Sequence, residues 1–135
     1  MRTIDHIGIA VRSLDERRKL YEALGLELSG EETVAEQRVR IAFLPVAGTR
    51  LELLEPTTPD SPIAGFIEKR GEGLHHLCLE VEDIVATMER LRSQGFNLLS
   101  SEPQKGAHGA RVCFIHPKSA GGVLIELSQP GGHRM

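Results

Sequence analysis

The feature that most constrains the fold is an internal repeat. Residues 4–11 (IDHIGIAV) and residues 74–81 (LHHLCLEV) share one pattern of alternating side chains, and His6 corresponds to His76, 70 residues later. A period of two residues is typical of a strand that buries one face. In each copy the histidine therefore lies on the face opposite to a row of apolar side chains. A repeat of this kind determines the architecture.

The repeat extends to a second pair of segments. Residues 51–56 (LELLEP) correspond to residues 125–130 (IELSQP) with an offset of 74, so Glu52 corresponds to Glu126. Loops between the segments absorb the change in offset. The order of elements in each copy predicts two βαβββ modules, which form a cupped mixed sheet of the α+β class.

The two modules are expected to share one core, because about sixty residues are only marginally stable alone. We therefore expect a single domain over residues 1–135. Its predicted parts are module 1 at about residues 1–57, a linker rich in proline and glycine at about 58–72, and module 2 at about 73–130.

Local signals place the elements within each module. Ser13 with Glu16 three residues later is typical of a helix N-terminus, and Gly25 of a helix end. Asp83 and Gly95 bound the equivalent helix in the second copy. We expect a polar loop at 31–37, a short helix at 63–69 and a frayed tail at 131–135. The predicted strands are 4–11, 26–29, 39–44, 50–55, 74–81, 96–99, 111–116 and 123–128.

Composition excludes several classes of partner. The net charge is −3, and the chain has no basic cluster of the kind that neutralises nucleic-acid phosphates. No apolar run approaches the roughly twenty residues of a membrane span. The first expected strand begins almost at Met1, which leaves no room for a signal peptide, so we expect a cytoplasmic protein. Cys78 and Cys113 fit neither a disulfide framework nor a metal-ligand spacing, and both are expected to be small buried side chains.

The repeated polar residues form a candidate metal site. If each sheet curls with its polar face inward, His6, Glu52, His76 and Glu126 converge on one point. Two imidazoles and two carboxylates are a donor set that divalent cations prefer, and the two negative charges balance the ion. When each residue is considered alone, the alternative to a metal ligand is an ordinary polar side chain on a strand face that contacts solvent. His116, at the end of a strand, is a candidate substrate contact.

At this point the residues resemble a known family. One histidine and one glutamate from each βαβββ module are typical of the vicinal oxygen chelate superfamily, also called glyoxalase-like. More narrowly, the sequence is similar to the methylmalonyl-CoA epimerases over nearly its whole length. The segments that carry this similarity are residues 4–11, 51–56, 73–76 and above all 116–119 (HPKS) with 122–127 (GVLIEL).

The resemblance implies a set of roles. His6, His76 and Glu126 match the family's metal ligands, and Glu52 matches a position that holds Gln or Glu. The implied cofactor is a divalent ion, with cobalt, manganese, nickel, zinc and magnesium left open. Some epimerases also carry a glutamate on the third strand as a base. Here that region, residues 39–42, reads VRIA and contains no acid.

The implied reaction interconverts (R)- and (S)-methylmalonyl-CoA. A proton leaves the α-carbon and returns on the other face through a metal-stabilised enolate. Inversion suits two acid–base groups on opposite sides, and Glu126 and Glu52 are the candidates. Lys118 and Ser119 are expected to hold the carboxylate or the CoA phosphate of the acyl-CoA substrate. We also expect a homodimer.

Three alternatives stay open from the sequence. Glyoxalase I, a lactoylglutathione lyase, also uses two His–Glu pairs and related proton chemistry, although the loop from Lys118 to Gly122 favours the epimerase. An extradiol dioxygenase would use two histidines and one carboxylate, so the fourth ligand counts against it. A metal-free module of the same fold would bind small molecules without catalysing a reaction.

Overall fold

The computed structural model describes residues 3–131, which form two compact units. The N-terminal unit is His6–His75. Among the described residues, the C-terminal unit consists of residues 76–131 together with residues 3–5. The two boundaries fall inside strands β1 (Ile4–Ala10) and β5 (Gly73–Glu80). The predicted fraying of the tail concerns residues 131–135, of which 132–135 lie outside the described part of the chain.

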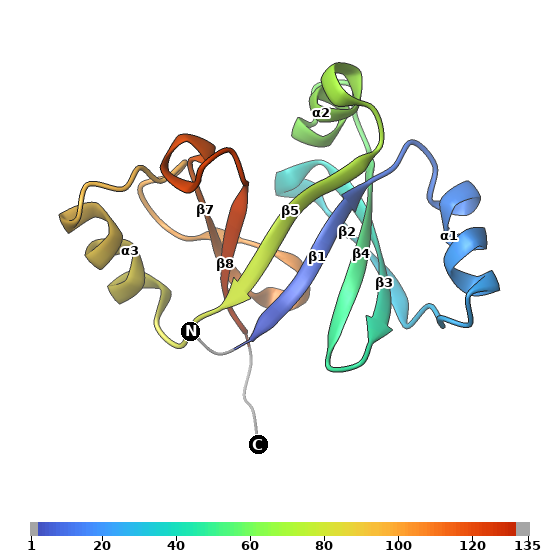
Figure 1. Ribbon diagram of the computed structural model, residues 1–135, viewed down its shortest axis with the longest axis horizontal. Coiled ribbons are helices and arrows are strands. Elements are labelled where there is room, and N and C mark those ends of the chain that lie inside the picture. Colours follow the sequence, from blue (N-terminus) through green and yellow to red (C-terminus); the bar gives the residue numbers. More distant parts are fainter. Residues whose placement is uncertain (1–2, 132–135) are drawn as a thin grey trace. The chain divides into compact units, whose positions relative to one another are not determined.

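The N-terminal unit has the order βαβββ, followed by a helix. Strand β1 pairs with β4 in parallel, and β4, β3 and β2 are successive antiparallel neighbours (Figure 1). Its elements after β1 are α1 (Leu14–Ala23), β2 (Gly30–Val34), the 3-10 turn η1 (Ala35–Gln37), β3 (Val39–Val46), β4 (Thr49–Pro56) and α2 (Pro62–Arg70).

The C-terminal unit repeats this plan. Strand β5 pairs with β8 in parallel, and β8, β7 and β6 are antiparallel neighbours. Its elements after β5 are α3 (Ile84–Ser93), β6 (Gln104–Lys105), the 3-10 turn η2 (Ala107–Gly109), β7 (Arg111–Ile115), the 3-10 turn η3 (Pro117–Ala120) and β8 (Ile125–Gln129). The prediction of two βαβββ modules in an α+β fold is confirmed.

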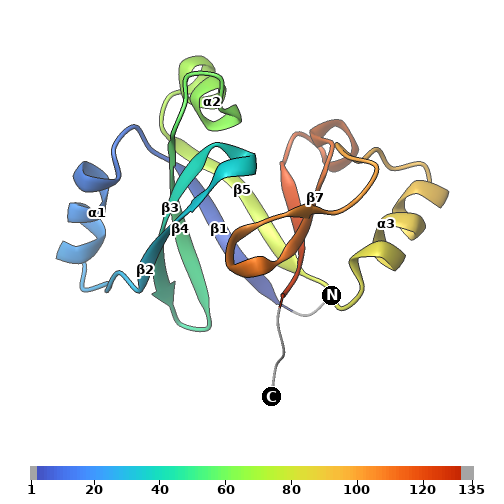
Figure 2. The ribbon, with the colours of Figure 1, turned by 180° about the vertical axis from the view of Figure 1, so that it is seen from behind.

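Each unit has its own apolar core between a helix and the sheet. The Oγ of Ser13 caps α1 by accepting a hydrogen bond from the backbone N–H of Glu16, and Asp83 caps α3 in the same way. Leu14 and Ile84 begin the two helices, and both are fully buried. Seen from behind in Figure 2, α1 lies along the strands of its unit and α3 beside β7. The core clusters are Val11, Leu14, Ala42, Leu44 and Leu53 in one unit, and Val81, Ile84, Met88, Cys113 and Leu127 in the other.

Two predicted edge strands were placed wrongly. Strand β2 spans Gly30–Val34, most of which was expected to be a polar loop, whereas the expected strand at 26–29 is irregular. Leu26 and Leu28 pack against the core from this irregular segment. The strand forms because β3 supplies its hydrogen-bond partners, and Arg40 of β3 donates to Glu31 across the pair at 2.9 Å. Cross-strand partners stabilise a polar edge that has no apolar alternation.

The equivalent strand of the C-terminal unit was also wrong. No strand covers residues 96–99, where Leu98 makes an isolated bridge to Ile115. The short β6 lies later, at Gln104–Lys105, where no strand was expected. The predicted linker helix at 63–69 is confirmed as α2, with the Ser61 hydroxyl capping its first turn. No helix of the described residues is long and apolar enough to cross a membrane.

Candidate active site

In the N-terminal unit, His6 and Glu52 form a buried pair. The imidazole Nδ1 of His6 lies 3.2 Å from the carboxylate Oε2 of Glu52. The parallel pairing of β1 with β4 explains the contact, because it sets Gly8 beside Glu52 and His6 is two residues before Gly8 on the same face. His6 is 5% exposed and Glu52 2%. A histidine and a carboxylate are thus held together away from water.

In the C-terminal unit, His76 and Glu126 form the equivalent pair. Here Nε2 of the imidazole lies 2.9 Å from Oε1 of the carboxylate. The pairing of β5 with β8 sets Cys78 beside Glu126, as Gly8 lies beside Glu52. The two units therefore repeat the same local arrangement, although a different ring nitrogen faces the carboxylate in each.

An aromatic ring lies beside each glutamate on the neighbouring strand. Phe43 of β3 is the cross-strand partner of Glu52, and Phe114 of β7 is the partner of Glu126. The rings of Phe114 and His76 meet edge to face, with centroids 6.0 Å apart. These rings give both carboxylates an apolar flank, where electrostatic interactions are stronger than in water.

Arg50 is a contact of Glu52 that the sequence analysis did not identify. Its Nε and its Nη2 each lie 2.8 Å from Oε2 of Glu52. The guanidinium also lies over the ring of Phe43, 5.7 Å from the centroid. The signal was present in the sequence, since residues two apart on a strand share a face. At the equivalent place before Glu126, the repeat has Leu124.

The three predicted substrate-binding residues lie in one short turn of the C-terminal unit. Nδ1 of His116 accepts a hydrogen bond from the backbone N–H of Lys118 at 3.1 Å. The Oγ of Ser119 accepts one from the backbone N–H of Asn97 at 3.0 Å. The main chain of the turn is thus held in place, while the Lys118 side chain does not take part in these bonds. A role in substrate binding stays a prediction for all three.

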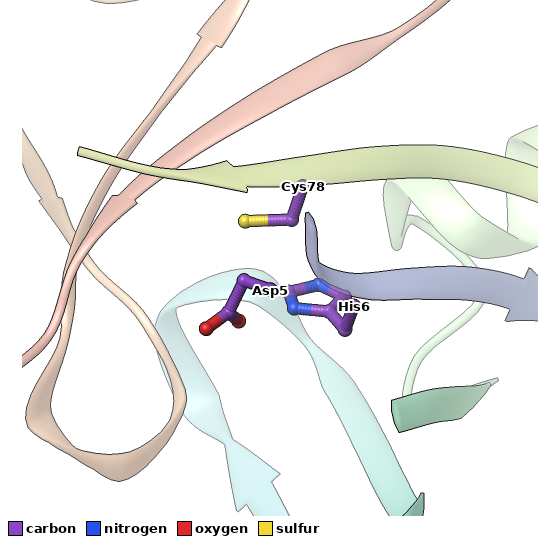
Figure 3. Close-up of side chains that lie close together, drawn as sticks. All are labelled: Asp5, His6 and Cys78. Atoms are coloured by element: carbon purple, nitrogen blue, oxygen red, sulfur yellow. The ribbon is translucent and has the colours of Figure 1, made fainter. Parts of the chain in front are cut away.

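The cysteines are buried, as predicted. Cys78 and Cys113 are both 0% exposed, and both are free thiols. Burial raises the pKa of Cys113 to about 11, and the negative charge of Glu126 adds to this effect. Cys113 is therefore a neutral thiol at physiological pH. The sulfur of Cys78 lies within 4.8 Å of a carboxylate oxygen of Asp5 (Figure 3).

The acid expected on the third strand of an epimerase is absent, as the sequence indicated. The eight residues of β3 read VRIAFLPV. Along the chain, the nearest acid before β3 is Glu36, an exposed residue of η1.

The donor atoms suit a divalent cation. Each unit offers one imidazole and one carboxylate, both of them buried, and these groups are common ligands of divalent transition metals. The pairing of carboxylate with imidazole within each unit orients the ring. The chemistry of the two pairs therefore fits the metal that the sequence resemblance implied.

The chain can be assigned to a superfamily of known proteins. A profile of the Glyoxalase/Bleomycin resistance protein/Dioxygenase superfamily matches residues 5–114. The chain belongs to this superfamily, and the predicted vicinal oxygen chelate fold is confirmed.

Several relatives of the chain are named as epimerases. The chain is 43% identical over 129 residues to the ethylmalonyl-CoA/methylmalonyl-CoA epimerase of Cereibacter sphaeroides, covering 93% of this chain and 96% of the relative. The crystal structure of methylmalonyl-CoA epimerase from Mycobacterium tuberculosis is 42% identical, with a TM-score of 0.91, covering 96% of this chain and 88% of that one. The resemblance to these enzymes is confirmed.

A third relative was solved with a bound ligand. It is a variant of the Streptomyces coelicolor methylmalonyl-CoA epimerase in complex with 2-nitronate-propionyl-CoA. It is 37% identical, with a TM-score of 0.95, and the match covers 100% of this chain and 99% of that chain.

Proposed function

We propose that the protein is a methylmalonyl-CoA epimerase, an isomerase that interconverts the (R) and (S) forms of its substrate. The observation that carries this proposal is the buried His–Glu pair that each βαβββ unit holds at the same place. Relatives at about 40% identity over most of the chain are named for this activity. The fold alone would not decide, because one superfamily hosts several chemistries.

The proposed metal ligands are His6, Glu52, His76 and Glu126. The two pairs supply two neutral nitrogens and two carboxylate oxygens, and which divalent ion they take stays open. When bound, the cation would polarise the thioester carbonyl of the substrate and stabilise the negative charge that develops as the α-proton leaves. No change of oxidation state is involved.

Glu126 is the proposed proton-transferring group. It is buried, and Phe114 is its cross-strand partner. A carboxylate in such a position is a candidate general base for removing the α-proton. Epimerisation requires a second group on the opposite face of the α-carbon. Glu52 is the proposed second group, and its Oε2 accepts a hydrogen bond from Arg50 and lies near His6.

Lys118, Ser119 and His116 are the proposed contacts of the acyl-CoA. The ammonium of Lys118 provides a positive charge for a carboxylate or a phosphate. The imidazole of His116 accepts a bond at Nδ1, which in the neutral ring leaves Nε2–H available as a donor. We also propose that the protein is a homodimer, that it forms a single domain over residues 1–135 and that it is located in the cytoplasm.

The experiment uses one epimer of methylmalonyl-CoA in deuterated water. Purified protein should convert it to the other epimer and place deuterium at the α-carbon, and treatment with a chelator should abolish both changes. Added divalent ion should restore them. Metal analysis that finds stoichiometric metal, together with conversion, distinguishes the enzyme from a metal-free binding module. Turnover of a glutathione hemithioacetal without turnover of the acyl-CoA would instead favour a glyoxalase I activity and contradict the proposal.

A further inference from the structure

Arg50 and Glu52 lie two residues apart on β4 and therefore on the same face of the sheet. Nε of Arg50 donates a hydrogen bond to Oε2 of Glu52 at 2.8 Å, and Nη2 lies at the same distance from that oxygen. These distances are typical of charge-assisted hydrogen bonds, which are stronger than those between neutral groups. The side chain of Glu52 is 3% exposed and that of Arg50 is 26% exposed. Arg50 thus restrains the position of a buried carboxylate.

Phe43 restrains the guanidinium of Arg50 in turn. It is the residue paired with Glu52 across β3 and β4, which makes it a diagonal neighbour of Arg50 on the same face. The guanidinium lies over its ring, 5.7 Å from the centroid. An arginine can stack on an aromatic ring and pair with a carboxylate at once, which a lysine does less well. Two contacts within the N-terminal unit therefore set the position of the guanidinium.

The same oxygen of Glu52 faces the imidazole of His6. Nδ1 of His6 lies 3.2 Å from Oε2, the atom that Arg50 also contacts. An ionised carboxylate only accepts hydrogen bonds, so in a neutral ring the nitrogen that faces it carries the hydrogen. The ring is then in the Nδ1–H tautomer, and its lone pair is on Nε2. Of the two nitrogens of His6, Nε2 is therefore the one that can coordinate a cation.

We propose that Arg50 is a positioning residue that holds the Glu52 carboxylate against His6 and so fixes which imidazole nitrogen can coordinate a divalent cation. The inference rests on the proposed function, in which His6 is a metal ligand. Arg50 acts through Glu52, and both of them, with Phe43 and His6, belong to the N-terminal unit. Groups that orient a ligating histidine in this way raise its affinity for the metal.

The proposal predicts that replacing Arg50 weakens metal binding. In Arg50→Gln the Glu52 carboxylate loses its restraint, so the dissociation constant for Zn²⁺ should rise by about 10- to 100-fold. The charge of Arg50 alone predicts the opposite, because removing a positive charge beside a cation site would tighten binding. Arg50→Lys keeps the charge but loses the planar group, and its dissociation constant should rise by at least about fivefold. Isothermal titration calorimetry of the metal-depleted full-length protein with ZnCl₂ measures these constants.

The ring nitrogens of His6 provide a second readout, which does not depend on activity. ¹⁵N NMR of the metal-depleted full-length protein shows which nitrogen carries the hydrogen, and the His6 signals are assigned by their loss in His6→Asn. In the native protein we expect a single state with the hydrogen on Nδ1. In Arg50→Gln we expect the ring to be no longer held in this single state. A residue that only supports the fold would leave the state of the ring unchanged in a folded variant.

The outcomes separate this inference from the proposed function. Circular dichroism verifies folding, Arg50→Lys keeps the test possible if Arg50→Gln does not fold, and Arg18→Gln on α1 is the control with native affinity. If the native protein binds Zn²⁺ and epimerises the substrate, native or tighter binding in either Arg50 variant overturns the inference alone. A native His6 ring in any other state, or an unchanged ring in Arg50→Gln, also overturns it. If the native protein binds no divalent cation, the proposed metal site fails, and the inference fails with it.

Discussion

Nε2 of His76 lies 2.9 Å from Oε1 of Glu126, and Phe114 packs edge-on against the same imidazole. The ring is therefore fixed from two directions by residues of neighbouring strands. Their positions follow from the pairing of β8 with β5 and β7, in which Glu126 faces Cys78 on one side and Phe114 on the other. Side chains held by neighbouring strands in this way keep a fixed geometry.

Replacing Glu126 by Gln should abolish most proton exchange. The amide keeps nearly the same shape but cannot take up the α-proton, so we expect exchange into deuterated water to fall by about 10²- to 10⁴-fold. Mass spectrometry of the recovered acyl-CoA measures the incorporated deuterium. Glu89→Gln, at an exposed position of α3, is the control and should retain native exchange. Full exchange in Glu126→Gln would remove this residue from the mechanism as a base.

Comparing exchange with epimerisation should identify the second acid–base group. When one of two bases is lost, the other can still exchange the α-proton of one epimer, although inversion stops. We expect Glu52→Gln to stop inversion but retain exchange, so that the two rates separate by at least about tenfold. Glu36→Gln, at an exposed position of η1, is the control and should keep both rates. A parallel fall of both rates in Glu52→Gln would mean that Glu52 acts only as a ligand and not as the second base.

Replacing Lys118 by Ala should weaken substrate binding with little effect on the chemical step. The turn is held by main-chain contacts, including the N–H of residue 118 to His116, and alanine keeps them. The lost ammonium should raise KM for methylmalonyl-CoA by about tenfold and change kcat by less than about threefold. Steady-state kinetics measure both, and Lys69→Ala on α2 is the control. An unchanged KM would show that Lys118 makes no contact with the substrate.

The repeat was the part of the fold that could be predicted most fully. The spacing of His6 to His76 and of Glu52 to Glu126 predicted two equivalent modules. This was possible because a strand with one buried face shows alternating apolar and polar residues in the sequence. The repeat also implies that the contact of β5 with β8 is equivalent to that of β1 with β4, although the parallel direction of both contacts comes from the structure. Helix starts at Ser13 and Asp83 were also predictable, since capping is a local property.

The edges of the sheets could not be predicted in the same way. Strand β2 alternates weakly and is rich in polar residues, and its conformation depends on pairing with β3, the next strand of the chain. The same holds for β6, which has only two residues. Arg50 was missed for a different reason. Its position on the strand placed it on the face of Glu52, but its approach to Phe43 and Glu52 depends on side-chain packing.

The last prediction concerns the stability of the N-terminal unit and its dependence on pH. Glu72, between α2 and β5, accepts hydrogen bonds from Nε and Nη2 of Arg17 at 2.9 and 3.1 Å. Those bonds lower the pKa of Glu72 below its ordinary value of 4.5, against the smaller opposing effect of burial. The backbone N–H and the guanidinium of Arg12 lie on the same carboxylate and act in the same direction.

Because the pKa of Glu72 is lower in the folded than in the unfolded protein, its contribution to stability is present above the unfolded value and is lost as the pH falls through the folded value. Glu72→Gln should therefore unfold at a lower temperature than the native protein at pH 7, and the difference should shrink progressively below about pH 4.5 as the native carboxylate takes up its proton. Thermal unfolding by circular dichroism across this range measures it. Glu68→Gln, at an exposed position of α2, should show no such convergence. A deficit of equal size at pH 7 and at pH 3 would mean that Glu72 stabilises the unit by packing and not by its charge.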